Sequence, residues 1–171
     1  MERELRKNES TLASVGTGIM WFGIWSAIKS ILIFVSNVTG TSGDLAKYEG
    51  VERTVAVVVL VMIMALMVII PLKIHFYVGR AARAEARGEK RKGAYIVIAG
   101  IMFAFNILGI VLNIWIITTG GFSFNGQDSI DEMLVTVIVD ITLAYLLLLM
   151  MITAVKVRRA HRAAVLPGEG A

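Results

Sequence analysis

The chain has 171 residues, of which 57% are hydrophobic and 18% are charged, and its formal net charge is +4. The charged residues stand between long apolar runs instead of alternating with apolar residues, which is typical of a membrane protein and excludes a soluble domain. The chain contains no cysteine, which excludes disulfides, thiolate metal ligands and thiol catalysis. Its basic residues flank the apolar runs, so we expect no nucleic-acid partner.

Four apolar segments are each long enough, at about 1.5 Å per residue, to cross a hydrocarbon core of about 30 Å. They are residues 12–38, 54–78, 94–117 and 133–155. The first is too long for the apolar region of a cleavable signal peptide, and we expect it to remain in the mature protein. The sequence therefore predicts an all-α, polytopic integral membrane protein, a four-transmembrane-helix bundle built from two tandem helical hairpins.

The distribution of Lys and Arg predicts how these helices are oriented, because cytoplasmic segments of membrane proteins are enriched in both. Fourteen of them lie on the side that holds both termini and the middle connection, and only Lys47 and Arg53 lie on the other side. We therefore expect both termini in the cytoplasm and the protein in the inner membrane of a bacterium. The expected cytoplasmic segments are 1–11, 79–93 and 156–171, and the expected outer loops are 39–53 and 118–132, the second of which is acidic.

The basic middle connection, GRAARAEARGEKRKG at 79–93, is rich in helix-forming residues. It predicts that the second helix continues into the cytoplasm until Gly88 and Gly93 break it. Two interpretations of its charge remain open. It binds the anionic headgroups of membrane lipids or an acidic partner, or it only anchors the adjoining helices on the cytoplasmic side.

Two charged residues lie inside the expected spans, where each costs at least about 2.5 to 3.5 kcal/mol unless it finds a partner. Lys29 lies nine residues before Val38, about 13 Å from the outer end of its helix, and Asp140 lies seven residues after Met133, about 10 Å from the outer end of its own. Because the two opposite charges lie at similar depth on different helices, we expect them to form an interhelical pair.

Other polar side chains recur at helical spacing near this pair. Ser26 and Ser30 flank Lys29, Thr136 lies one turn before Asp140, and Asn106 and Asn113 are seven residues apart on the third span. Trp21 and Trp25 share the face of Lys29, and we expect them to pack within the bundle rather than form a ligand cage. The candidate site is therefore Lys29, Asp140, Asn113 and Asn106, with Ser26, Ser30 and Thr136 as secondary groups.

Two functions are compatible with this set of residues. In the first, the protein binds or transports a small ion or polar solute at the intramembrane polar site. In the second, the Lys29–Asp140 pair is purely structural, and the protein is a non-transporting scaffold or an accessory subunit of a larger complex. The second span has no strongly polar side chain between Val55 and Ile70, so we expect it to face lipid, a second copy of the chain or a partner membrane subunit.

No catalytic set is visible in the sequence. An intramembrane enzyme needs a nucleophile with a base, or a metal site, and the polar groups at depth are the ones already named. His75, just beyond Pro71, is expected to be a residue of the membrane border rather than a proton relay, and His161 is too isolated to predict a metal site. We therefore expect no enzymatic activity, no metal and no cofactor.

Overall fold

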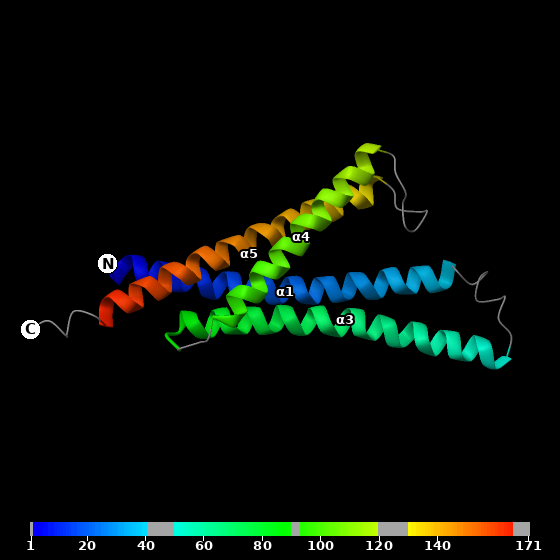
Figure 1. The fold of residues 1–171 in the computed structure, drawn as a ribbon, viewed down its shortest axis with the longest axis horizontal. Coiled ribbons are helices and arrows are strands. Elements are labelled where there is room, and N and C mark those ends of the chain that lie inside the picture. The colour runs from blue at the N-terminus through cyan, green and yellow to red at the C-terminus, as the bar shows by residue number, and fades with distance from the viewer. Residues whose placement is uncertain (1, 41–49, 90–92, 120–129, 166–171) are drawn as a thin grey trace, which may run out of the picture. The chain divides into compact units, whose positions relative to one another are not determined.

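The computed structural model describes the backbone of residues 2–40, 50–89, 93–119 and 130–165, and their side chains except those of 33, 36–40, 130–133 and 164–165. Four helices make up most of these residues: α1 (Glu2–Gly40), α3 (Gly50–Ala86), α4 (Ala94–Thr119) and α5 (Ile130–Val165) (Figure 1). No strand occurs in the described ranges. All four helices are long and apolar enough to cross a membrane, so the all-helical, four-helix prediction is confirmed.

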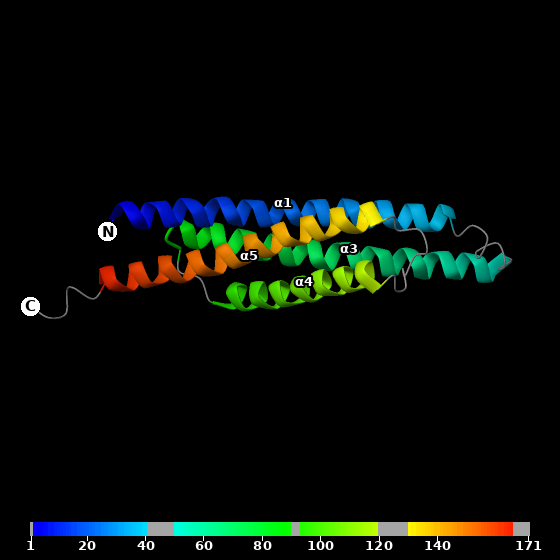
Figure 2. The same ribbon diagram turned by 90° about the horizontal axis from the view of Figure 1, so that it is seen from above.

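The helices contribute to two compact units. Unit 1 contains residues 1–19 and 78–171, and unit 2 contains residues 20–77. Unit 1 therefore holds the start of α1, the end of α3 and the whole of α4 and α5. Unit 2 holds the remainder of α1 and α3, which form an antiparallel helical hairpin in both views (Figures 1 and 2).

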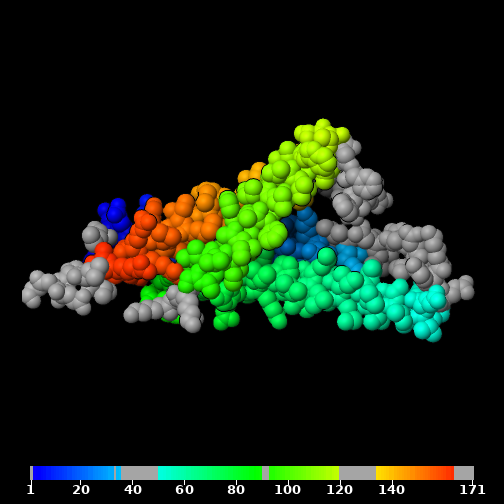
Figure 3. Space-filling model, in the orientation of Figure 1, coloured from blue at the N-terminus to red at the C-terminus, as the bar shows by residue number. Residues whose placement is uncertain are grey.

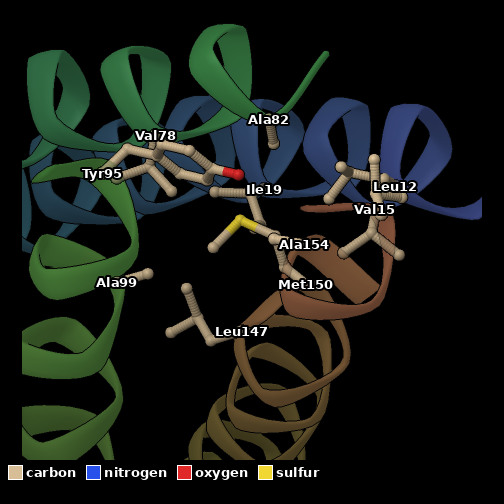
Figure 4. Close-up of a cluster of buried hydrophobic side chains, with 11 residues drawn as sticks. Leu12, Val15, Ile19, Val78, Ala82, Tyr95, Ala99, Leu147, Met150 and Ala154 are labelled. Carbon is tan, nitrogen blue, oxygen red and sulfur yellow. The ribbon is translucent and has the colours of Figure 1, made fainter. Parts of the chain in front are cut away.

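The core of unit 1 is a cluster of buried apolar side chains from all four helices (Figure 4). Tyr95, Leu12, Ile19, Leu147 and Met150 are its largest fully buried members. The smaller members, among them alanines, let the helices approach closely, as is usual where helices pack in a membrane. Leu12, Val15, Ile19, Val78, Ala82, Tyr95, Ala99, Leu147, Met150, Ala154 and Val157 make up the cluster.

Gly16 and Gly79 form a close contact between α1 and α3 in unit 1. A Cβ atom added to Gly16 would lie 2.8 Å from the backbone oxygen of Gly79 and 3.2 Å from the Cβ atom of Ala82. Any side chain at position 16 would therefore push the two backbones apart. The absence of a side chain at Gly16 therefore permits the close packing of α1 and α3.

The last turns of α3 extend past the apolar segment, as expected for the middle connection. One face of these turns, which includes Ala82 and Glu85, is buried, and the opposite face, which includes Arg80 and Arg83, is exposed. The helix ends at Ala86, and Gly88 follows with a φ of +81°, a conformation that glycine adopts without steric cost. The break predicted at Gly88 is confirmed.

The surface of unit 2 is strongly apolar. The most hydrophobic window of α3 contains no buried residue, and large side chains such as Met62, Leu66 and Met67 are more than half exposed. In the space-filling view, side chains of α3 cover the length of this helix on the face turned to the viewer (Figure 3). An apolar surface of this extent fits lipid or a partner helix and does not fit water.

Candidate functional site

The α4–α5 pair in unit 1 carries four of the seven predicted site residues, and contacts between the two helices fix their register. A Cβ atom added to Gly93 would lie 3.0 Å from Nη1 of Arg158, and one added to Gly100 would lie 3.9 Å from Sδ of Met151. Position 93 therefore pairs with position 158, and position 100 pairs with position 151, as expected for two antiparallel helices with equal rise per residue. If this pairing is continued toward the C-terminal end of α4, Val111 lies opposite Asp140.

A second, smaller core cluster shows which faces meet in the outer part of this pair. Ile110 of α4 packs with Val137 and Ala144 of α5. Asn106 and Asn113 lie four residues before and three residues after Ile110, and therefore on the same face of α4. By the same spacing, the face of α5 that carries Val137 and Ala144 also carries Asp140.

The polar residues along this interface form what we call the α4–α5 seam, defined as Asn106, Asn113, Thr136 and Asp140. All four are half-buried. By the register, Asn113 lies opposite a residue two positions from Asp140, an axial offset of about 3 Å, whereas Asn106 lies opposite a residue five positions away, about 7.5 Å toward the N-terminal end of α4. The seam therefore has two polar levels. We call the level at Asp140 and Asn113, nearer the C-terminal end of α4, the outer level, and the level at Asn106 the inner level.

Asn106 has an unusual environment at the inner level. Its side-chain oxygen Oδ1 is buried and has no hydrogen-bond partner within the described part of the chain. A buried carbonyl oxygen without a donor costs about 1 to 3 kcal/mol, so such groups are rare in structures unless they serve a purpose. Asn106 therefore provides an acceptor that can coordinate a cation or receive a hydrogen bond from a polar solute.

The remaining predicted site residues belong to unit 2. Lys29, Ser26 and Ser30 lie on the part of α1 that follows Ile19, and all three are half-buried. Since Lys29 lies in unit 2 and Asp140 in unit 1, the pairing of these two residues stays a prediction. The two tryptophans on the same helix face are exposed, Trp21 by 65% and Trp25 by 52%, so the packing role expected for them is wrong.

His75 lies against α1 within unit 2 and is buried, and its position at the membrane border stays a prediction. Its Nδ1–H donates a hydrogen bond of 2.8 Å to the carbonyl oxygen of Pro71 one turn earlier. A Cβ atom added to Gly23 would lie 2.6 Å from the Cβ atom of His75, so the absence of a side chain at position 23 makes room for the histidine. Glycine is therefore required at this α1–α3 contact.

A third polar group, formed by the C-terminal parts of α3 and α5 and the start of α4 in unit 1, was not predicted from the sequence. The carboxylate of Glu85 accepts two hydrogen bonds from Arg158, from Nε to Oε1 at 2.6 Å and from Nη2 to Oε2 at 2.7 Å. The hydroxyl of Tyr95 donates a further hydrogen bond of 2.8 Å to Oε2. We call these three residues the Glu85 network, and it joins α3, α4 and α5.

The carboxylate at the centre of the Glu85 network is buried and accepts hydrogen bonds at both oxygens. The side chain of Glu85 is only 6% exposed, and that of Arg158 is 28% exposed. The guanidinium also lies over the ring of Tyr95, 5.6 Å from its centroid, where a cation–π interaction adds to the ion pair. Since the carboxylate is bound by three donors, the network acts as a structural link between helices and offers no free group for chemistry.

A further side-chain contact joins α1 and α5. Nε2 of His161 on α5 lies 3.1 Å from a carboxylate oxygen of Glu9 on α1, and both side chains are partly exposed. We expected His161 to be isolated, but helix packing in unit 1 gives it this acidic neighbour. No group of three or more His, Cys, Asp or Glu side chains that could hold a metal ion occurs among the described residues.

Comparisons with other proteins supply no family for this arrangement. The chain matches no protein-family model, no curated protein and no solved structure.

Proposed function

We propose that this chain is a multi-pass protein of the bacterial inner membrane, with four spanning helices and both termini in the cytoplasm. The strong asymmetry of Lys and Arg between the two sides supports this orientation. The length and apolar character of all four helices support the membrane placement. Under this orientation, the Glu85 network lies near the cytoplasmic surface and the outer level of the seam lies in the outer half of the bilayer.

Within this frame, we propose that the protein binds or passes a small ion or polar solute along the α4–α5 seam. The observation that carries the proposal is the buried Oδ1 atom of Asn106, which has no donor among the described residues. It shares a helix face with Asn113 and with Ile110, which packs against the face of α5 that carries Asp140. Polar residues at two levels of an intramembrane interface are the arrangement expected of a site or pathway, because burying them has a cost that a purely packed interface avoids.

The test is a flux measurement in proteoliposomes with three probes, namely protons, Na⁺ and K⁺. We expect the wild-type protein to carry at least one probe faster than protein-free vesicles. We expect Asp140→Asn and Asn106→Leu each to reduce this flux by about tenfold or more, as the loss of a hydrogen bond to a charged ligand would.

The matched control is Thr142→Val. Thr142 lies on α5 between Val137 and Ala144 in sequence, but its side chain is exposed. Its hydroxyl donates a hydrogen bond to the carbonyl oxygen of Ile138 in its own helix. We expect this variant to retain wild-type flux. Flux of no probe above that of empty vesicles, or equal loss in all three variants, would contradict the proposal.

The apolar surface of α3 favours a second candidate function, that of an accessory subunit in a larger membrane complex. The hydrophobic window of this helix has no buried residue, and methionines such as Met62 and Met67, whose flexible side chains adapt to different partners, are exposed along it. Purification in mild detergent separates the two candidates. An accessory subunit is expected to co-purify with a defined partner and to show no flux when reconstituted alone.

A further inference from the structure

The C-terminal turns of α3 and α5 in unit 1 are amphipathic, and their arginines form two groups. One group is exposed, and the other consists of Arg158, which turns into the protein. On α5, Ala154 and Val157 are buried, whereas Arg159 and Arg162 lie on the opposite, exposed face. Arg158 is directly adjacent to Arg159 in sequence but turns inward to Glu85. The same division occurs on α3, where Ala82 is buried and the arginines at positions 80 and 83 are exposed.

Three acidic residues of unit 1 are engaged by other partners. Glu85 is bound by Arg158, Glu89 by Arg87 at 2.8 Å, and Glu9 faces His161. Glu2 and Glu4, at the start of α1, are fewer than the four exposed arginines, so an excess of positive charge remains. These four, which we call the arginine surface, are Arg80, Arg83, Arg159 and Arg162.

The positions of these residues along the helices match the headgroup layer of a bilayer. Arg80 and Arg83 lie two and five residues beyond Val78, and Arg159 and Arg162 lie four and seven residues beyond Val155. At about 1.5 Å per residue, the four Cα atoms fall about 3 to 10 Å outside the expected hydrocarbon boundary. The polar layer on each side of a bilayer occupies about 5 to 8 Å, which long arginine side chains reach from these positions.

We propose that the arginine surface binds the phosphodiester headgroups of anionic phospholipids. A guanidinium group presents paired donors that match two phosphate oxygens, which a point charge does not. The proposal rests on the proposed membrane placement and cytoplasmic orientation, but it does not depend on any flux through the seam. Arg158 is not part of the arginine surface, because its Nε and Nη2 groups already donate hydrogen bonds to Glu85.

The test is lipid titration of the purified full-length chain in a nonionic detergent, followed by native mass spectrometry. We expect phosphatidylglycerol to bind at least tenfold more tightly than phosphatidylcholine. We expect the double variant Arg83→Gln/Arg159→Gln to weaken phosphatidylglycerol binding about 25-fold, from about fivefold for each cation removed. Both residues are exposed, so thermal unfolding is expected to be unchanged.

Two further variants make the test specific. Arg3→Gln/Arg53→Gln removes the same charge from exposed positions outside the arginine surface, and we expect phosphatidylglycerol binding within twofold of wild type. Arg83→Lys/Arg159→Lys keeps both cations at the site and is expected to bind within about threefold, which controls for any loss of folding in the glutamine variant.

Three results would overturn the proposal. Equal weakening by the two glutamine pairs would show a general effect of net charge. Equal affinity for phosphatidylglycerol and phosphatidylcholine would show that the headgroup charge is not recognised. Competition by glycerol phosphate at the same concentration as the lipid would show a soluble phosphate ligand instead. None of these results bears on the flux measurement, so the two proposals fail separately.

Discussion

Replacement of Arg158 by glutamine is expected to lower the free energy of unfolding by about 3 kcal/mol. The substitution leaves the carboxylate of Glu85 buried with only the hydroxyl of Tyr95 as a donor, and removal of one partner from a buried ion pair costs about 3 to 5 kcal/mol. Because the side chain of Arg158 is partly exposed, we expect a value at the lower end of this range. Thermal and denaturant unfolding in detergent measure the effect.

Three related variants test the cause of this loss. Arg159→Gln changes the adjacent, exposed arginine and is expected to leave stability within about 0.5 kcal/mol of wild type. Arg158→Lys is expected to recover only part of the loss, because an ammonium group cannot reproduce the two parallel hydrogen bonds. The double variant Glu85→Gln/Arg158→Gln is expected to be more stable than Arg158→Gln alone. Equal effects at positions 158 and 159 would contradict the role of the Glu85 network.

Replacement of Gly16 by leucine is expected to destabilise the protein by about 3 kcal/mol. The first atom of the new side chain would lie 2.8 Å from the backbone oxygen of Gly79, so the contact is relieved only by moving a whole helix. Overpacking of a tight interface costs about 1 to 3 kcal/mol, and a leucine adds three further carbon atoms at this point. The measurement is again the free energy of unfolding in detergent.

Gly109→Leu is the matched control for this substitution. A Cβ atom at Gly109 meets nothing within 4 Å, so the first atom of the new side chain has no neighbour to displace. Replacement of a helical glycine also raises helix propensity by up to about 1 kcal/mol, and we expect this variant to be as stable as wild type or slightly more stable. A loss of stability at Gly109 as large as that at Gly16 would mean that the close α1–α3 contact is not the cause.

The helices were the most predictable feature of this chain, because predominantly apolar segments of more than twenty residues leave few alternatives. The polar seam was predictable in part. The seven-residue spacing of Asn106 and Asn113 identifies a single helix face without reference to any other helix. The existence of two levels needs the register between α4 and α5, which glycine contacts in the structure supply and which no local pattern contains.

The Glu85 network could not be predicted by the same reasoning. Arg158 and Arg159 are identical residues side by side, and only the phase of α5 against its neighbours decides which of them turns inward. Glu85 lies in the basic segment 79–93, whose charge is accounted for by the expected membrane orientation, so nothing in that segment singles out this glutamate. A signal was nevertheless present, since Val78, Ala82 and Glu85 recur at helical spacing on one face.

His75 shows the same limit on single-sequence reasoning. Its position after Pro71 gives no sign of its burial, and α3 continues for eleven residues beyond that histidine, as the middle connection predicts. The residue that determines its burial is Gly23, which lies on another helix more than fifty residues away. A contact that depends on a glycine in another helix produces no sequence pattern around the histidine itself, so the burial of His75 could not be predicted from its neighbours in sequence.

The central claim is that the polar residues predicted inside the spans form a functional site, and a mutant cycle at Lys29 and Asp140, the two charged members of that set, tests it most directly. The variants are Lys29→Met, Asp140→Asn and the double substitution, each measured for thermal stability in detergent and for flux of protons, Na⁺ and K⁺ in proteoliposomes. We predict that both single variants unfold within a few degrees of wild type and lose most of the flux. If instead each single variant unfolds at a much lower temperature, the double variant recovers that stability, and flux is unchanged throughout, the residues are a structural pair and the claim is wrong.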